Sequence, residues 1–450
     1  MKRLNSNIII YSLVSLSVLI FISNIFNYDP RNGYDGDAHY EYIKFVSMYL
    51  PNEFKLPTSQ DTYEFFSPPL AYIVPSFVGL GCRMLIESSD FVRDCYIYQE
   101  NLTQLTQVIM YIFLIIIFIQ IAKLLFPNDK KFRNTLLMFL ILMSPNYRAF
   151  MMFRGEPYVV LFMSIMILYL ILIYKNKIKL NFFNSLVFGL LIGLISLSRQ
   201  WGFLFFPSVV YFLYIARRRL DTKKLFLFFC FSSFIGFLIS GWFYLGLYNT
   251  YGTFAKFNLE PNEISLINLI KVMILNSNVQ EIFTNPTRTS SLNGLYPIFY
   301  SDLWGDYSAY FSYLDYKFNG RDLSYENYLG RVNLVSIYPT LLIIFGFLYF
   351  FVRSLVTKRK DSLVSIFESF FVFNLISTWI FYCLWISIYS FREGIVDGIS
   401  AVYMLQIVNV LPFIAAMFCK RVYDYYPKFY LINIGILSLV FLHNINVIYL

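Results

Sequence analysis

Long blocks of apolar residues are the feature of this chain that most restricts its fold. Each block is close to the ~20 residues that carry a helix across ~30 Å of hydrocarbon. Charged residues make up only 14% of the chain, against about 25% in soluble domains. A soluble helical protein would need polar helix faces that these blocks lack, so the sequence predicts an integral membrane protein. The blocks cover 8–26, 108–126, 157–174, 225–247, 334–352, 363–389 and 429–442.

The predicted fold class is all-α, a polytopic bundle of about eleven transmembrane helices. The first block exceeds the ~7–15-residue core of a signal peptide and precedes no A-x-A-like cleavage site, so we expect it to be a retained span. The third span is short, and we expect its end to be partly re-entrant. The spans are 8–26, 104–126, 134–146, 157–174, 182–198, 201–216, 225–247, 333–352, 363–389, 399–418 and 429–448.

The basic residues predict the orientation of the bundle. With Lys2 and Arg3 in the cytoplasm, the inner segments hold short tracts of Lys and Arg, whereas the outer segments are longer and carry most of the acids. This pattern agrees with the positive-inside rule. The rule also accounts for the net charge of +9 without a nucleic-acid partner. The inner tracts are 127–133, 175–179, 217–224, 353–360 and 420–428.

We treat residues 1–450 as one membrane domain with two long outer loops, 27–103 and 248–332. The first loop contains an apolar stretch, 69–86, that would invert the charge pattern if it crossed the membrane, so it predicts an interfacial helix on the outer surface. The second loop is rich in Tyr, Asn, Ser and Asp, which suits a folded cap at headgroup depth. Its Trp304 is suited to stacking on a sugar or, alternatively, to anchoring at the interface.

The five cysteines are scattered and the chain has only two histidines, so no zinc site is expected. Cys82 and Cys95 fall in the first outer loop. They can pair in an oxidising compartment, although proximity in one loop does not establish the bond.

An acidic motif just outside the first span is the densest group of titratable residues, Asp35-Gly36-Asp37-Ala38-His39-Tyr40-Glu41. Neighbouring carboxylates raise one another's pKa, and a partly dehydrated carboxylate is a competent general base. Two other interpretations stay open. Asp37 can cap a surface helix, or Asp35 and Asp37 can hold a divalent cation. Metal-dependent enzymes of that kind need a soluble nucleotide domain, so we expect no required cofactor.

Arginines at the predicted outer helix ends form the second candidate group. They are Arg148, Arg154 with Glu156, Arg199 and Arg392. An Arg near membrane depth is costly and usually has a partner or a function. Guanidinium groups bind phosphate bidentately, and a phosphate-bearing ligand at this depth would be a lipid. Snorkelling to headgroups, or a pair such as Arg154 with Glu156, is the alternative for any single Arg.

The order of these motifs resembles the GT-C superfamily of membrane glycosyltransferases, especially the bacterial branch related to protein O-mannosyltransferases and aminoarabinose transferases. The resemblance covers the acidic motif at 35–43, Ser67-Pro68-Pro69-Leu70-Ala71-Tyr72 before the second span, and 397–405 late in the chain. Related enzymes often carry Lys or Arg in the late element. This chain has Ile399 and Ser400 there, with Arg392 upstream.

The resemblance implies transfer of one sugar from a polyprenyl-phosphate carrier to an acceptor hydroxyl on a lipid, glycan or protein, with inversion at the anomeric carbon. It implies a site on the periplasmic or luminal face, in a bacterial inner membrane rather than the endoplasmic reticulum. Asp37 matches the family's base best and Asp35 second. The departing lipid phosphate also needs its growing negative charge stabilised, and we expect Arg154, Arg199 and Arg392 to bind it. Glu41 and Glu156 are expected to orient these groups, with His39 as a hydrogen-bonding neighbour.

A transporter or flippase of sugar lipids is the alternative from another functional class. Transporters place binding charges near the bilayer midplane, often on broken helices. Here the predicted mid-span positions are nearly free of charge, while carboxylates and arginines gather on one face. That asymmetry favours an enzyme of the outer face.

Overall fold

The fold is seen in a computed structural model of the chain, and it is helical apart from one short strand pair in the residues described. Strand β1 (Phe391–Arg392) pairs antiparallel with β2 (Ile395–Val396). The model describes residues 6–32, 35–50, 52–85, 91–257, 267, 270, 279–288, 294–309, 323–356, 362–389, 391–392, 395–396 and 399–449.

The first half of the chain supplies helices α1 to α10 and one 3-10 helix, η1. They are α1 (Ser6–Ile25), α2 (Gly36–Tyr49), α3 (Leu70–Leu85), α4 (Phe91–Leu125), α5 (Lys130–Leu142), α6 (Ser144–Ala149), α7 (Glu156–Tyr174), α8 (Phe182–Ser198), η1 (Gln200–Phe205), α9 (Phe206–Ala216) and α10 (Thr222–Tyr251).

The second half supplies both short and long helices. They are α12 (Glu281–Thr284), α13 (Leu295–Trp304), α15 (Leu323–Val335), α16 (Ile337–Val356), α17 (Leu363–Tyr389), α18 (Leu405–Val408), α19 (Leu411–Tyr425), α20 (Phe429–His443) and α21 (Ile445–Ile448).

Seven helical segments of the described chain are long and apolar enough to cross a membrane: Ser6–Ile25, Cys95–Leu125, Glu156–Tyr174, Thr222–Tyr251, Tyr325–Val356, Leu363–Tyr389 and Leu405–Tyr425. They confirm the predicted multi-pass architecture at seven of its positions. The four other predicted spans coincide with shorter helices, namely α5 with 13 residues, α8 with 17, α9 with 11 and α20 with 15.

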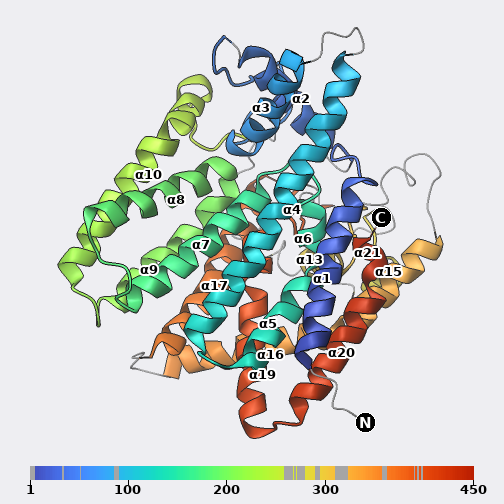
Figure 1. Cartoon of the computed structure of the whole chain (residues 1–450), viewed down its shortest axis with the longest axis vertical. Helices are drawn as coiled ribbons and strands as arrows, with labels where there is room; N and C mark the ends of the chain where they lie inside the picture. The colour runs from blue at the N-terminus through green and yellow to red at the C-terminus, as the bar shows by residue number, and fades with distance from the viewer. Residues whose placement is uncertain are drawn as a thin grey trace.

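The helices form a tilted bundle with two short helices at one end (Figure 1). Helices α2 and α3 lie together at the top, beside the first turns of α4 and above α1, whereas α1 begins at the bottom. The connection between α19 and α20, which contains a predicted inner tract, also lies at the bottom (Figure 1). Helix α3 packs against α2 and α4 and corresponds to the apolar stretch 69–86. It therefore lies at the end of the bundle expected to face outward.

Two helix boundaries differ from the predicted spans, and both differences affect the candidate site. The third predicted span, 134–146, breaks at Met143, whose extended backbone separates α5 from the short helix α6. The late span predicted at 399–418 begins as a helix only at Leu405 and continues to Tyr425. Residues 401–404 form turns instead, and Ser400 and Ala401 donate hydrogen bonds to the Asp302 side chain.

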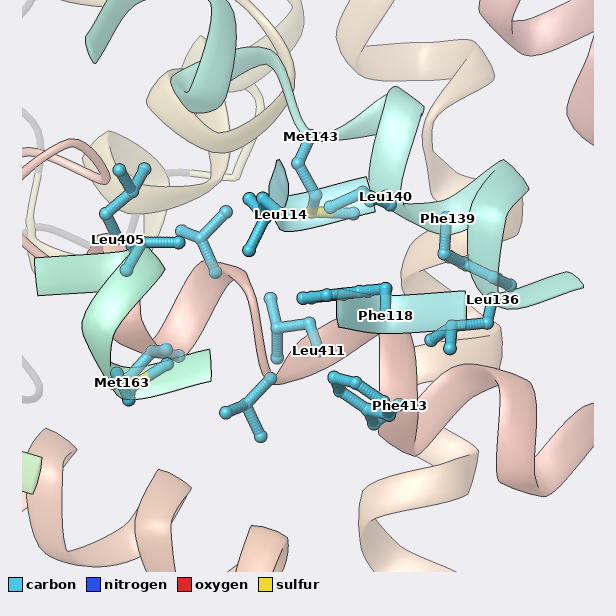
Figure 2. Packing of buried hydrophobic residues seen from close by; sticks show 14 of the residues in the cluster. Leu114, Phe118, Leu136, Phe139, Leu140, Met143, Met163, Leu405, Leu411 and Phe413 are labelled. Carbon is cyan, nitrogen blue, oxygen red and sulfur yellow. The ribbon is translucent and has the colours of Figure 1, made fainter. Parts of the chain in front are cut away.

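Bulky apolar side chains fill the centre of the bundle. In Figure 2, Leu114 and Phe118 of α4 face Leu136 and Phe139 of α5, and Phe413 of α19 packs beside them. Phe413 is 1% exposed, and the other four side chains are fully buried. These side chains therefore form an apolar part of the interior between α4, α5 and α19.

A disulfide joins Cys82 of α3 to Cys95 of α4, which confirms the pairing that the sequence left open. Disulfides persist in oxidising compartments. The bond is therefore consistent with an outward-facing position of α2 and α3.

The disulfide closes a loop with a sequence separation of 13 residues. Replacing both Cys82 and Cys95 by Ser is expected to lower the free energy of unfolding by about 3 kcal/mol, because the unfolded chain gains loop entropy. Thermal denaturation in detergent measures the effect. Cys230→Ser is the control, since Cys230 is a free, exposed cysteine, and an equal melting temperature for all three proteins would contradict the expectation.

Candidate functional site

Arg199 is the centre of a buried charge network between two helices. Helix α8 ends at Ser198, and Arg199 takes an extended conformation (φ −160°, ψ 147°) before η1 begins. Its Nη1 lies 3.1 Å from Oε2 of Glu64, and its Nε lies 3.1 Å from Oε1 of Glu156. The side chains of Arg199, Glu64 and Glu156 are 7%, 3% and 1% exposed. A single guanidinium group thus binds two carboxylates away from water.

Gly155 explains how Glu156 reaches Arg199. A Cβ atom on this glycine would lie 1.9 Å from the carbonyl oxygen of Ser198, so only glycine permits the backbones to approach this closely. The approach brings the first turn of α7, which carries Glu156, against the end of α8.

Glu64 enters the network from the first outer loop. Its carboxylate accepts a hydrogen bond from Ser67, whose hydroxyl in turn accepts one from Arg199 Nη1 at 2.5 Å. Ser67 is followed by Pro68 and Pro69, which lead directly into α3. The motif Ser67-Pro68-Pro69 therefore connects the network to the start of α3.

His39 of α2 lies beside this connection. Its Nδ1 is 2.7 Å from the hydroxyl of Tyr72 in α3 and 3.8 Å from Oε2 of Glu64. Burial lowers the pKa of the His39 imidazole to about 3, against the opposing attraction of Glu64 and with a further contribution from Arg154 and Arg199. His39 is therefore neutral at physiological pH. Its Nε2 is buried and has no hydrogen-bond partner in the part of the chain that the structure describes.

The neutrality of His39 predicts an unusual titration. Because the folded pKa of about 3 lies below the ordinary value of ~6.5, His39 stabilises the fold above pH ~6.5, and this stability is lost as the pH falls toward 3. Nitrogen-15 solid-state NMR of histidine-labelled protein in lipid reports the charge state. The chain has only two histidines, so His443→Gln assigns the signals. We expect the His39 signal to remain neutral at pH 5, and a half-protonated signal near pH 6.5 would contradict this.

Glu64 titrates below its usual range as well. Burial by itself opposes ionisation, but the charges of Arg199 and Arg154 and the hydrogen bond from Ser67 hold the pKa of the Glu64 carboxyl below its usual range. The network therefore holds an ionised carboxylate at neutral pH.

The two aspartates of the acidic motif face different surroundings. Asp35 precedes α2 in a left-handed conformation (φ 63°) and makes no side-chain capping bond. Part of the Asp35 side chain is exposed to solvent, and the rest is covered by protein atoms. This partial burial and the charge of Glu64 raise the pKa of Asp35, while Arg154, Arg199 and Arg288 lower it to a smaller extent. Asp37 is exposed in the first turn of α2, and its charge acts on Arg31.

Asp35 therefore lies near enough to the network for the charges of Glu64, Arg154 and Arg199 to act on it, whereas the charge of Asp37 acts on Arg31. The alternative in which Asp37 caps the helix is wrong, because α2 begins one residue earlier, at Gly36, and Asp37 lies inside it. Glu41 is exposed on the same helix.

The arginines predicted from the sequence lie in different parts of the structure. Arg154 is 2% exposed, its guanidinium carbon lies 5.8 Å from the ring centre of Tyr403, and its charge acts on Asp35, His39 and Glu64. Arg148 is fully buried elsewhere, in an ion pair with Asp302 at 3.2 Å, which connects α6 to α13. Arg392 belongs to β1, and its side chain lies outside the described part.

Three residues of this region were missed by sequence reasoning. Glu64 is a lone acid among aromatic residues, and its position three residues before Ser67-Pro68 was the available signal. Arg288 comes from the second outer loop, and Tyr403 from the turns before α18. Nothing in their local sequence indicates proximity to Asp35, because they are separated from it by more than half of the chain.

No cluster of three or more His, Cys, Asp or Glu residues suited to a metal ion occurs in the described residues. Asp35 and Asp37, proposed above as an alternative cation site, therefore have no third ligand of these types within that part of the chain.

Comparisons with known proteins add no assignment. No protein-family model matches this chain, and neither a curated protein nor a solved structure matches it.

Proposed function

We propose that this protein is a membrane glycosyltransferase that moves one sugar from a polyprenyl-phosphate carrier to an acceptor hydroxyl on the outer face, in a bundle of about eleven spans of the GT-C type. The observation that carries the proposal is the convergence of Asp35, Glu64, Arg154, Glu156 and Arg199 at one location. Buried charges with shifted pKa values cluster at functional sites.

The reaction is a single displacement at the anomeric carbon. The acceptor oxygen forms a bond to this carbon, the bond from carbon to the phosphate oxygen breaks, and polyprenyl phosphate leaves with the bonding electrons. A carboxylate of the acidic motif takes the hydroxyl proton. Asp35 is our first choice for this base because its surroundings raise its pKa, and Asp37, the better match by motif, is the second.

The departing phosphate needs its growing negative charge stabilised. Arg199 is already bound by two carboxylates, so its role is to hold Glu64 and Glu156 in place. Arg154 and Arg288, whose charges act on Asp35, are the proposed phosphate ligands, with Arg392 as a further candidate from the sequence. His39 and Glu156 orient the substrates.

One feature favours a second function, a flippase of sugar lipids. The third predicted span is broken at Met143, between α5 and α6, and α6 carries Arg148 in a buried ion pair with Asp302. Broken helices with charged sites occur in transporters. Unlike the glycosyltransferase, a flippase would leave the sugar attached to its lipid.

The test uses purified protein in lipid vesicles with radiolabelled polyprenyl-phosphate sugars, including hexoses and pentoses. Release of polyprenyl phosphate with labelled product supports the proposal. Movement of intact sugar lipid across the vesicle without donor consumption supports the flippase. If neither transfer nor movement is observed, both functions are overturned. The same assay with EDTA tests the divalent cation.

A further inference from the structure

Aromatic rings from four segments of the chain meet next to the charge network. Trp201 of η1 lies 4.6 Å from Trp385 of α17 and 6.0 Å from Tyr403, measured between ring centres. The rings of Trp201 and Tyr403 are nearly parallel, with an interplanar angle of 27°. Phe257 lies 5.5 Å from Trp385 and 6.1 Å from Trp201. We call Trp201, Phe257, Trp385 and Tyr403 the aromatic cluster.

The aromatic cluster and the charge network are directly connected. Trp201 is two residues after Arg199 in the chain, and the Arg154 guanidinium lies over Tyr403 at 5.8 Å. A ligand bound through its phosphate at the network therefore has aromatic rings within reach.

Two buried polar atoms in this region have no hydrogen-bond partner among the described residues. One is the indole Nε1 of Trp385, a donor, and the other is Oε1 of Gln200, an acceptor. The Gln200 amide is held in place because its Nε2 donates to the carbonyl oxygen of Phe66 at 2.9 Å. Buried polar groups in native proteins are almost always hydrogen-bonded. An unmatched donor and an unmatched acceptor beside aromatic rings indicate a ligand with apolar faces and polar edges.

A pyranose ring has this combination, because its C–H faces stack on aromatic rings while its hydroxyls both donate and accept hydrogen bonds. Binding sites for small molecules typically combine aromatic walls with a few polar groups. A belt of aromatic anchors at headgroup depth would be exposed, whereas Trp201 is only 7% exposed. Trp304, which the sequence offered for sugar stacking, is 1% exposed and belongs to the apolar core.

We infer that the aromatic cluster, with Trp385 Nε1 and Gln200 Oε1, binds the pyranose ring of a lipid-linked sugar. The inference rests on the proposed function and adds where the sugar of the donor lies. Trp201 and Tyr403 supply stacking surfaces, Trp385 donates to one hydroxyl, and Gln200 accepts from another.

The experiment measures binding rather than transfer, so that the sugar and the lipid phosphate are tested separately. Wild-type protein in nanodiscs is titrated with farnesyl phosphate, farnesyl phosphomannose and farnesyl phosphoglucose, and each Kd is determined. Trp385→Phe keeps an aromatic ring and removes the N–H donor. Gln200→Met keeps the length of the side chain and removes the acceptor. Trp242→Phe is the matched control, because Trp242 is exposed on α10.

We expect Trp385→Phe and Gln200→Met each to weaken binding of at least one sugar lipid about tenfold, the size of one lost hydrogen bond, without changing the Kd of farnesyl phosphate. The control should bind all three ligands as the wild type does. Equal weakening for all three ligands, or unchanged binding in both variants, would overturn the inference while leaving the proposed function intact. If the wild type binds none of the three ligands, the proposed function fails and the sugar site fails with it.

Discussion

Replacing Arg199 by Met is expected to destabilise the protein by about 3–5 kcal/mol at neutral pH, because it leaves Glu64 and Glu156 buried without their cation. The side chains of these two carboxylates are 3% and 1% exposed, so solvent cannot replace the lost guanidinium. We expect transfer activity to be lost as well, since the first outer loop is attached to α8 through this residue. Thermal denaturation and transfer assays at pH 7 measure both effects.

The pH dependence distinguishes a charge effect from a packing effect. In the wild type the folded pKa of Glu64, about 2, lies below the unfolded value of ~4.3. Glu64 therefore stabilises the fold above pH ~4.3, and this stability is lost as the pH falls toward 2. In Arg199→Met, one of the groups that offset burial is lost, so the folded pKa of Glu64 rises and the stability that its ionised form contributes falls. The stability deficit of the variant should then be largest at neutral pH and shrink on acidification.

Two further variants serve as controls. Adding Glu156→Gln to Arg199→Met removes one uncompensated charge and should recover part of the stability. Arg217→Met removes an exposed arginine that lies over Tyr214 and should melt as the wild type does. A deficit in Arg199→Met that is the same at pH 5 and pH 7 would mean that lost packing, and not buried charge, explains it.

Asp35→Asn is expected to reduce the rate of transfer by about 100-fold or more, because removal of a general base typically costs between two and four orders of magnitude. Asp37→Asn is the matched variant, two residues away and exposed on α2, and we expect it to keep most of the activity. Melting temperatures of both variants should stay close to that of the wild type. If Asp37→Asn loses transfer activity and Asp35→Asn keeps it, Asp37, the residue that the motif favours, is the general base instead.

The pH dependence of the transfer rate is a second test of Asp35 as the base. Partial burial and Glu64 raise the pKa of Asp35, and a base acts only when deprotonated. The transfer rate should therefore decline as the pH falls toward this raised pKa, at a higher pH than an ordinary carboxyl would produce. The same decline in Asp35→Asn would assign the titration to another group.

Seven of the predicted spans and the helix at 69–86 were recognisable in the sequence because each depends on local composition. An apolar run near the length of a bilayer has one stable solution in lipid, a helix whose backbone bonds are satisfied within the segment. The positions of the helix breaks were harder to predict from the sequence. The break at Met143 and the late start of α18 at Leu405 depend on contacts with Asp302 and its neighbours, which lie more than 90 residues away in the chain.

The candidate site was predicted in part. The sequence identified Asp35 and His39 through the acidic motif. It identified Arg154, Glu156 and Arg199 through their position near the ends of apolar blocks, where an ionisable group is costly without a partner. It favoured Asp37 over Asp35, because both occupy the same motif and only the orientation of α2 separates them. It also left out Glu64, whose role depends on a contact with a residue 135 positions further along the chain.

The sequence by itself thus determined that the described chain contains apolar helices, seven of them long enough to cross a membrane, and it predicted their orientation. These follow from composition, length and the placement of Lys and Arg, and from the cost of moving charge into hydrocarbon. Only the tertiary structure decided which carboxylates share Arg199, that Cys82 and Cys95 are joined, and that His39 is neutral. Each of these depends on distances and burial between separate helices, because pair energies and desolvation change over a few ångströms.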